Sequence, residues 1–154
     1  MIKRSILYTL AAVLATVVVC FAADVNMGTW KLNEAKSKIA PGAPKNTTVV
    51  YEAAGDNIKV TVEGVDAEGK PTHNEWTGKF DDKDYPVTGD PTSDMRAYKQ
   101  VNDHTLDLTV KKDGKVTSTG KIVVAKDGKS RTVTLTGTDA KGEKMTSTAL
   151  YDKQ

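Results

Sequence analysis

The chain has 154 residues, a length typical of one domain, and its 22 basic and 20 acidic residues give a net charge of +2. Lys3 and Arg4 are the only charges among the first 22 residues, so residues 23–154 carry equal numbers of basic and acidic side chains. A neutral surface of mixed charge gives no electrostatic footprint for nucleic acid and no basic patch for a membrane surface. We therefore expect no nucleic-acid partner.

The first segment has the pattern of a secretory signal peptide. Lys3 and Arg4 precede an uncharged apolar run at residues 6–21, and Cys20 and Ala22 place small residues three and one positions before a cut after Ala22. The run is shorter than the about 20 residues that a membrane span needs. We expect residues 1–22 to be removed and the mature protein, residues 23–154, to be secreted or periplasmic, without a membrane span. An uncleaved anchor is the alternative.

Cys20 is the only cysteine of the chain and lies inside this expected signal peptide. The mature domain therefore has no disulfide, no thiolate nucleophile and no cysteine metal ligand. In a lipoprotein, Cys20 would become the lipidated first residue. The residues before it, 17–19, are three valines and lack the small residue that such a site has there. This favours the free form over a lipid-anchored one.

Residues 23–154 have the pattern of an all-β domain. Asp113-Gly114 and Asp127-Gly128 stand between β-type runs, which is a strong hairpin signal. Between such turns, apolar and polar side chains alternate, as in Ile58, Val60 and Val62, so one face of each strand is buried. The pattern predicts strands at 28–33, 46–54, 57–65, 72–80, 94–101, 104–111, 115–125, 129–138 and 143–152, a tenth short piece at 85–87, and a helical segment at 33–38.

The predicted strands follow one another as an antiparallel up-and-down meander. A long meander has two exposed edges unless it closes, and the polar outer face excludes a transmembrane barrel. We expect a small closed barrel of about eight to ten strands. A two-sheet sandwich is the rival fold, but most of the connections here are too tight for its long crossovers.

The two ends of the mature chain carry further motifs. Residues 28–32 read GTWKL and residues 149–154 read ALYDKQ. They resemble the first strand, with its G-x-W, and the closing tyrosine-acid-lysine segment of the lipocalin and fatty-acid-binding-protein superfamily, the calycins. Residues 27–39 and 84–89 also resemble those of secreted bacterial lipocalin-like proteins. The resemblance covers the whole mature chain and implies a barrel that binds a small apolar or amphipathic molecule.

The chain departs from this family at two places. Fatty-acid binders carry a helix-turn-helix lid after the first strand, whereas residues 34–45 are too few for two helices and include Pro41, Gly42 and Pro44. The mouth is therefore open or covered by a short loop. Those binders also place an arginine two residues before the closing tyrosine, where this chain has Ala149. The carboxylate clamp that the family implies is absent at that position.

Two arginines, Arg96 and Arg131, occur in residues 23–154. Arg131 is in phase with Val133 and Leu135, so we expect it on the inner face, where it attracts an anionic ligand group. The alternative is that it extends out of the barrel end. Arg96 and Tyr98 share a face, and the apolar residues that alternate with them indicate that both are exposed.

Aromatic side chains supply the remaining candidate ligand contacts. Tyr and Trp combine an apolar ring with a polar group, which suits a ligand pocket, although they also simply fill cores. The predicted ligand-binding set is Tyr51, Trp76, Phe80, Arg131 and Tyr151. Trp30, which corresponds to the tryptophan of G-x-W, is expected to have a structural role at one barrel end.

The sequence offers no chemistry for catalysis or metal binding. His73 and Glu75 share a face of one predicted strand and His104 lies on another, whereas a zinc site needs three or four convergent ligands. Residues 81–84 lack the regular spacing of a calcium loop. No nucleophile is paired with a base, so we expect no enzyme, cofactor or metal. The predicted function is an exported lipocalin-like carrier of a small apolar or amphipathic ligand. The alternative is a structural or protein-interaction barrel, an inhibitor or surface partner, with a filled core and no ligand.

Overall fold

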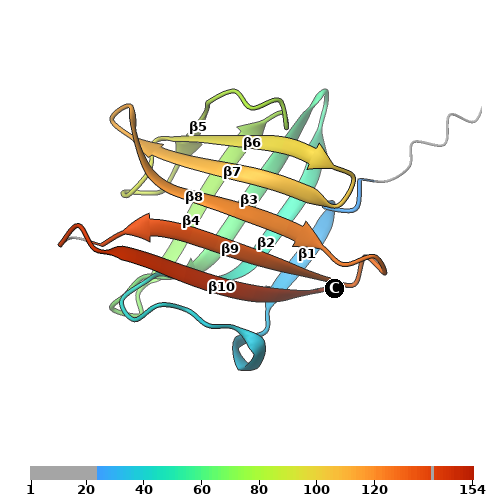
Figure 1. Ribbon diagram of the computed structural model, residues 1–154. Coiled ribbons are helices and arrows are strands. Elements are labelled where there is room, and N and C mark those ends of the chain that lie inside the picture. Colours follow the sequence, from blue (N-terminus) through green and yellow to red (C-terminus); the bar gives the residue numbers. More distant parts are fainter. Residues whose placement is uncertain (1–23, 140) are drawn as a thin grey trace, which may run out of the picture.

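A computed structural model describes residues 24–139 and 141–154, and within them it shows ten antiparallel strands and one short 3-10 helix, η1 (Figure 1). The predicted signal peptide and Cys20 lie outside the described residues. The elements in chain order are β1 (Gly28–Leu32), η1 (Glu34–Lys36), β2 (Lys45–Ala54), β3 (Asn57–Val65), β4 (Pro71–Gly78), β5 (Tyr85–Thr88), β6 (Met95–Asn102), β7 (Thr105–Lys112), β8 (Lys115–Val124), β9 (Ser130–Thr138) and β10 (Lys144–Lys153).

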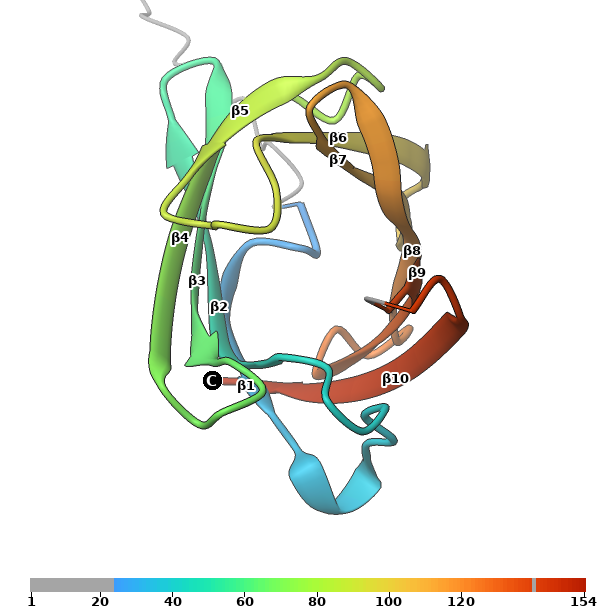
Figure 2. The same cartoon turned by 90° about the vertical axis from the view of Figure 1, so that its left-hand side faces the viewer.

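The strands close into a barrel in which each pairs with its neighbours in the sequence, and β1 also pairs with β10. Trp30 lies at this seam, opposite Lys153 on β10 and opposite Val49 on β2. In the view of Figure 2 the strands form a ring, in which β1 lies between β2 and β10. The predicted all-β fold, a closed up-and-down barrel with its first and last segments joined, is confirmed.

The predicted strand ranges agree with the structure to within a few residues. β4 ends at Gly78 rather than at residue 80, because the following segment leaves β3 and bonds to β6, where Asp82 N donates to Tyr98 O (2.9 Å). The predicted helix at 33–38 is only the single turn η1, begun by Asn33, whose side chain accepts a hydrogen bond from Lys36 N. Within the described residues, no helix is both long enough and apolar enough to cross a membrane.

The Asp113-Gly114 pair forms the turn that the sequence predicts. It joins β7 to β8 as a two-residue hairpin loop, and the φ angles of Asp113 and Gly114 are 50° and 75°. Two consecutive positive φ angles match the right-handed twist of the flanking strands, and an Asp-Gly pair adopts them readily.

The two ends of the barrel differ in how tightly they are filled. At one end, which we call the closed end, lie the β2–β3, β6–β7 and β8–β9 turns, and the side chains that fill it are buried, with Trp30 and Leu106 at 0% exposure and Trp76 at 1%. At the other, the open end, lie the β3–β4 and β7–β8 turns and the segment between β1 and β2.

The inner wall becomes progressively exposed toward the open end. On β7 the inward-facing Leu106 is buried, whereas the next two side chains on the same face, Leu108 and Val110, are half-buried. On β9 the inward-facing Arg131 is buried, whereas Val133 and Leu135 are half-buried. Solvent therefore reaches apolar side chains of the inner wall from the open end.

Candidate functional site

Arg131 lies on the inner wall near the closed end and is surrounded by aromatic rings. It is 2% exposed and pairs across the sheet with Tyr151 of β10. Its guanidinium carbon lies 4.8 Å from the ring centroids of Trp30 and Tyr51 and 5.0 Å from that of Tyr151. The fold thus brings together three of the predicted ligand-binding residues, Tyr51, Arg131 and Tyr151, with the structural Trp30.

The charge of Arg131 has no anionic neighbour in the part of the chain that the structure describes. No carboxylate there lies within 4.0 Å of the guanidinium, and Nε and Nη1 have no hydrogen-bond partner. The neighbouring tyrosines stay neutral: burial, with Tyr98 nearby, raises the pKa of Tyr51 well above its usual range, and burial raises the pKa of Tyr151 to about 12. Arg131 is therefore a desolvated cation held by ring faces, an arrangement suited to an anion.

Lys153 adds a second cation beside Trp30. Its Nζ lies 5.1 Å from the Trp30 ring centroid and donates a hydrogen bond to Val25 O (3.2 Å). Two positive groups over one aromatic ring raise the local potential at the closed end, which favours an anionic group over a cationic one.

Tyr151 connects β10 to the start of β2. Its hydroxyl donates to the backbone carbonyl of Asn46 (2.9 Å), next to the irregular pairing of β2 with β3 at Asn46 and Thr48. The tyrosine is thereby fixed between Arg131 and the open half of the barrel.

Trp76 and Phe80 belong to an aromatic cluster that fills the closed half. Their rings stack at 6.4 Å with an interplanar angle of 14°, and Tyr98 contacts Trp76 edge-on at 4.7 Å. Trp76 is 1% exposed and its Nε1 donates to Arg96 O (2.9 Å). These rings pack against one another, and their contact with a ligand stays a prediction.

Trp30 seals the closed end. It is fully buried, and its Nε1 donates to Asn26 O (2.8 Å) in the segment that precedes β1. A fully buried indole whose polar group is bonded to backbone contributes packing and fixes the entry of the chain into the barrel.

Arg96 and Tyr98 are buried, at 8% and 3% exposure, so the expectation that both are exposed is wrong. Three apolar residues suggested the opposite orientation, Met95, Ala97 and Val101. Met95 and Val101 are 38% and 50% exposed, whereas Ala97 is 4% exposed. Apolar side chains stand on both faces of this strand, so alternation alone does not decide which face is buried. The cross-strand pairing decides it, because Tyr98 lies opposite Leu108 on the inner wall.

Arg96 joins a polar group that the sequence analysis missed. Its Nη2 lies 3.4 Å from Asn74 Oδ1 and 3.7 Å from Asp90 Oδ2. Ser93 Oγ donates to Asp90 Oδ2 (2.6 Å), and Thr92 donates to Asp90 Oδ1 through its backbone N and its hydroxyl. The sequence did contain one indication of this group: Asn74 is two residues from Trp76 on β4, so both side chains lie on the inner face.

The charge of Asp90 is stabilised within this group. Burial by itself would raise the pKa of Asp90, but the hydrogen bonds from Ser93 and Thr92 and the charge of Arg96 together hold it below its usual range. Asp90 therefore remains a carboxylate at neutral pH, and the charge of Arg96 is balanced.

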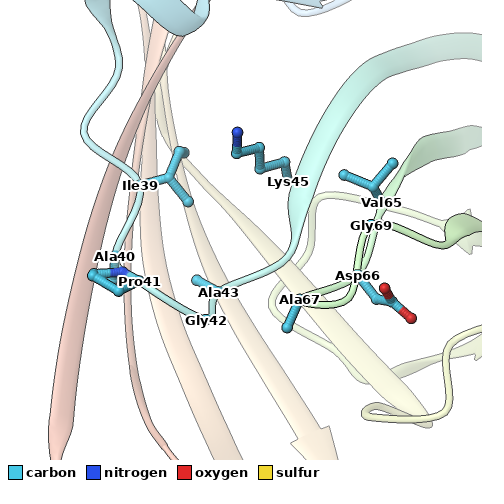
Figure 3. Close-up of a pocket in the computed structure, with 10 residues that line it drawn as sticks. All are labelled: Ile39, Ala40, Pro41, Gly42, Ala43, Lys45, Val65, Asp66, Ala67 and Gly69. Atoms are coloured by element: carbon cyan, nitrogen blue, oxygen red, sulfur yellow. The ribbon is translucent and has the colours of Figure 1, made fainter.

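A surface pocket of about 300 Å³ lies at the open end (Figure 3). The segment before β2 forms one side of it, from Ile39 to Lys45, and the β3–β4 turn forms the other. The backbones of Lys38 and Thr148 exchange two hydrogen bonds (2.7 and 2.8 Å), which holds this segment along β10. This short segment borders the open end of the barrel. The predicted ligand-binding residues do not line this pocket.

The histidines lie apart from the inner wall. His73 is exposed on β4, with Nδ1 2.5 Å from Glu63 Oε1 and Nε2 3.5 Å from Glu75 Oε1, whereas His104 contacts Val124 O at the closed end. Among the described residues, no three histidine, cysteine or acidic side chains form a group that could hold a metal ion.

These features define a closed, ten-stranded antiparallel barrel, within the described residues, with charged groups on its inner wall and one solvent-accessible end. The sequence matches no protein-family model and no curated protein. Its fold is similar to that of a solved structure, EF1p2_mFAP2b bound to DFHBI, with a TM-score of 0.52, 12% sequence identity, and coverage of 86% of this chain and 97% of that one. At this identity the likeness concerns the fold alone.

Proposed function

We propose that this protein is an exported, non-catalytic carrier of a small amphipathic anion, held in the barrel with its charged group against Arg131. The observation that carries the proposal is Arg131 itself, a guanidinium 2% exposed, with two donors that lack partners and no carboxylate neighbour among the described residues. A buried cation without a counter-charge costs several kcal/mol, and a bound anion would remove much of that cost.

The inner wall offers a place for the apolar part of such a ligand. On β9, Val133 and Leu135 follow Arg131 toward the open end, and both are half-buried. Leu108 and Val110 of β7 are half-buried on the same inner face. A ligand chain that covers these side chains gains about 25 cal/mol for each Å² of apolar surface it removes from water.

Two further arguments support a carrier. The barrel of similar fold, EF1p2_mFAP2b, is known bound to DFHBI, although fold likeness is only an analogy for function. The ends of the chain that resemble the calycins meet at the seam, where Leu32 lies opposite Tyr151. We propose on these grounds that the protein is a calycin-like binder.

Export is the part of the proposal that rests on the sequence alone. The apolar run at residues 6–21 and the small residues before the expected cut are its support. N-terminal sequencing of protein recovered from the periplasm or medium should begin at Ala23. A mature chain that begins at Met1, or that carries lipid on Cys20, would replace this proposal with the membrane-anchored alternative.

The binding experiment compares decanoate with decyltrimethylammonium, which has the same chain and the opposite charge. We expect calorimetric titration to show binding of decanoate only, and Arg131→Met to lose it. Lys121→Met is the matched control, because it removes one positive charge from an exposed side chain that pairs with Asp107. Equal binding of both amphiphiles, or equal loss in both variants, would refute the role of Arg131.

The packed aromatic cluster at the closed half favours the second candidate, a filled barrel that acts through its surface. Native mass spectrometry of gently purified protein separates the two. A co-purifying small molecule supports the carrier, whereas a bare mass together with no binding of decanoate supports the filled barrel.

A further inference from the structure

The two internal arginines differ in how their charge is balanced. Both are more than nine-tenths buried, Arg131 at 2% and Arg96 at 8% exposure. Arg131 has no carboxylate within 4.0 Å among the described residues, whereas Arg96 Nη2 lies 3.7 Å from Asp90 Oδ2. An anion placed at Arg131 would therefore meet a free positive charge, and an anion placed at Arg96 would meet a neutral pair.

The hydrogen bonding of Arg96 is nevertheless incomplete. Its contact with Asn74 Oδ1 is long, at 3.4 Å, and its Nε, which is buried, has no hydrogen-bond partner in the described structure. A buried donor without an acceptor costs about 1–3 kcal/mol, so an added oxygen acceptor at this place is favoured.

Asp90 decides which acceptor fits. Its carboxylate is fixed by three hydrogen bonds of 2.6 to 2.8 Å from Ser93 and Thr92, so it does not turn away from Arg96. A second carboxylate beside Arg96 would be repelled by Asp90 in a medium of low dielectric constant. An uncharged oxygen accepts a hydrogen bond from Nε without that repulsion.

The register of the strands places Arg96 toward the open half of the inner wall. Through the sheet it lies opposite Val110 of β7, which in turn lies opposite Ser118 of β8. Val110 and Ser118 are both half-buried, in the part of the inner wall that solvent reaches. Arg96 and Asn74 therefore border the open half of the barrel, whereas Arg131 lies at the closed end.

Resting on the proposed function, we propose that Arg96 and Asn74 form a second polar subsite that takes an uncharged oxygen of the ligand, a hydroxyl or a carbonyl, while Arg131 takes its anionic group. The ligand class is then a monoanion whose chain carries one further neutral oxygen, such as a hydroxylated or oxo-substituted carboxylate. Unsubstituted fatty acids leave Nε of Arg96 without an acceptor. Dicarboxylates place a second negative charge beside Asp90, which repels it.

The test uses calorimetric titration of the wild-type protein with decanoate, decanedioate and a set of hydroxydecanoates that differ in the position of the hydroxyl group. We expect one hydroxydecanoate to bind about tenfold more tightly than decanoate, the effect of one hydrogen bond from a charged donor. Decanedioate should bind no more tightly than decanoate. Arg96→Lys keeps the charge beside Asp90 and removes Nε, so it should lose the preference for the hydroxyl and retain the affinity for decanoate.

Asp90→Asn tests the charge argument directly, because it leaves Arg96 as an unbalanced cation. This variant should reverse the order and prefer decanedioate to decanoate. The subsite is refuted by decanoate binding without a hydroxyl preference, by a preference that survives Arg96→Lys, or by an Asp90→Asn variant that still rejects decanedioate. If Arg96→Lys does not fold, the hydroxyl preference of the wild-type protein and the behaviour of Asp90→Asn still decide the question. Absence of decanoate binding in wild type would instead refute the proposed function, and the subsite with it.

Discussion

Replacing Arg131 by methionine should stabilise the empty barrel while abolishing anion binding. In the structure two buried donors of Arg131, Nε and Nη1, have no acceptor in the described part of the chain. They cost about 1–3 kcal/mol each, and desolvation of the charge adds several kcal/mol. Three aromatic contacts at 4.8 to 5.0 Å return about 2 kcal/mol each. We therefore expect Arg131→Met to raise the free energy of unfolding by about 2 kcal/mol.

Arg96→Met is the matched variant, since it removes the other internal arginine. It leaves the carboxylate of Asp90 without its cation, so it should lower the free energy of unfolding by about 2 kcal/mol. The changes in the free energy of unfolding should therefore have opposite signs in the two variants, because only Arg96 has a counter-charge. A loss of packing alone would destabilise both variants.

The assay is urea unfolding followed by the fluorescence of Trp30 and Trp76, in a zwitterionic buffer without carboxylates. Added decanoate should stabilise wild type in proportion to its binding and leave Arg131→Met unchanged. An Arg131→Met variant that is less stable than wild type by about 1 kcal/mol or more would refute the reasoning, because the arginine would then be a structural residue held by its ring contacts.

Three further predictions concern stability. Folding lowers the pKa of Asp90, so its carboxylate stabilises the fold above the unfolded-state pKa of about 3.9, and this stabilisation is lost as the pH falls through the folded-state pKa. In Asp90→Asn, the free energy of unfolding measured by urea titration should therefore fall less steeply below about pH 4 than in wild type. Trp76→Phe leaves Arg96 O without its donor and should cost about 2 kcal/mol, measured by urea unfolding, while an unchanged midpoint would contradict the importance of that bond. Gly78→Ala places a methyl group 2.5 Å from Tyr85 Cγ and 2.7 Å from Trp76 Cζ2, so it should lower the thermal midpoint, equivalent to about 1–3 kcal/mol. An unchanged midpoint would contradict this prediction.

Much of the barrel could be predicted because its rules are local. Alternation with period two identifies which residues form strands, and Asp-Gly pairs identify hairpins, so the meander and its tight turns are written in short stretches of sequence. Closure follows from the same information, because a long meander leaves unpaired edges and a barrel does not. The same reasoning predicts that Trp30 lies on the first strand and that Arg131 shares a face with Val133.

Which face of β6 points inward could not be predicted from the sequence, because it depends on partners far away in the chain. Met95 and Val101 are apolar and exposed, whereas Arg96 is charged and buried, and no local pattern reverses that expectation. Arg96 is buried because its guanidinium contacts two polar side chains, the carboxylate of Asp90 in the β5–β6 loop and the amide of Asn74 on β4.

The sequence by itself determined the strand order, the turns and the residue types available to a binding site, since these depend on neighbours along the chain. Only the tertiary structure decided that Arg131 is enclosed by the rings of Trp30, Tyr51 and Tyr151, and that Arg96 has a counter-charge. The physical reason is that the balance of a buried charge depends on distances between strands, which barrel closure and register set and which no single segment contains.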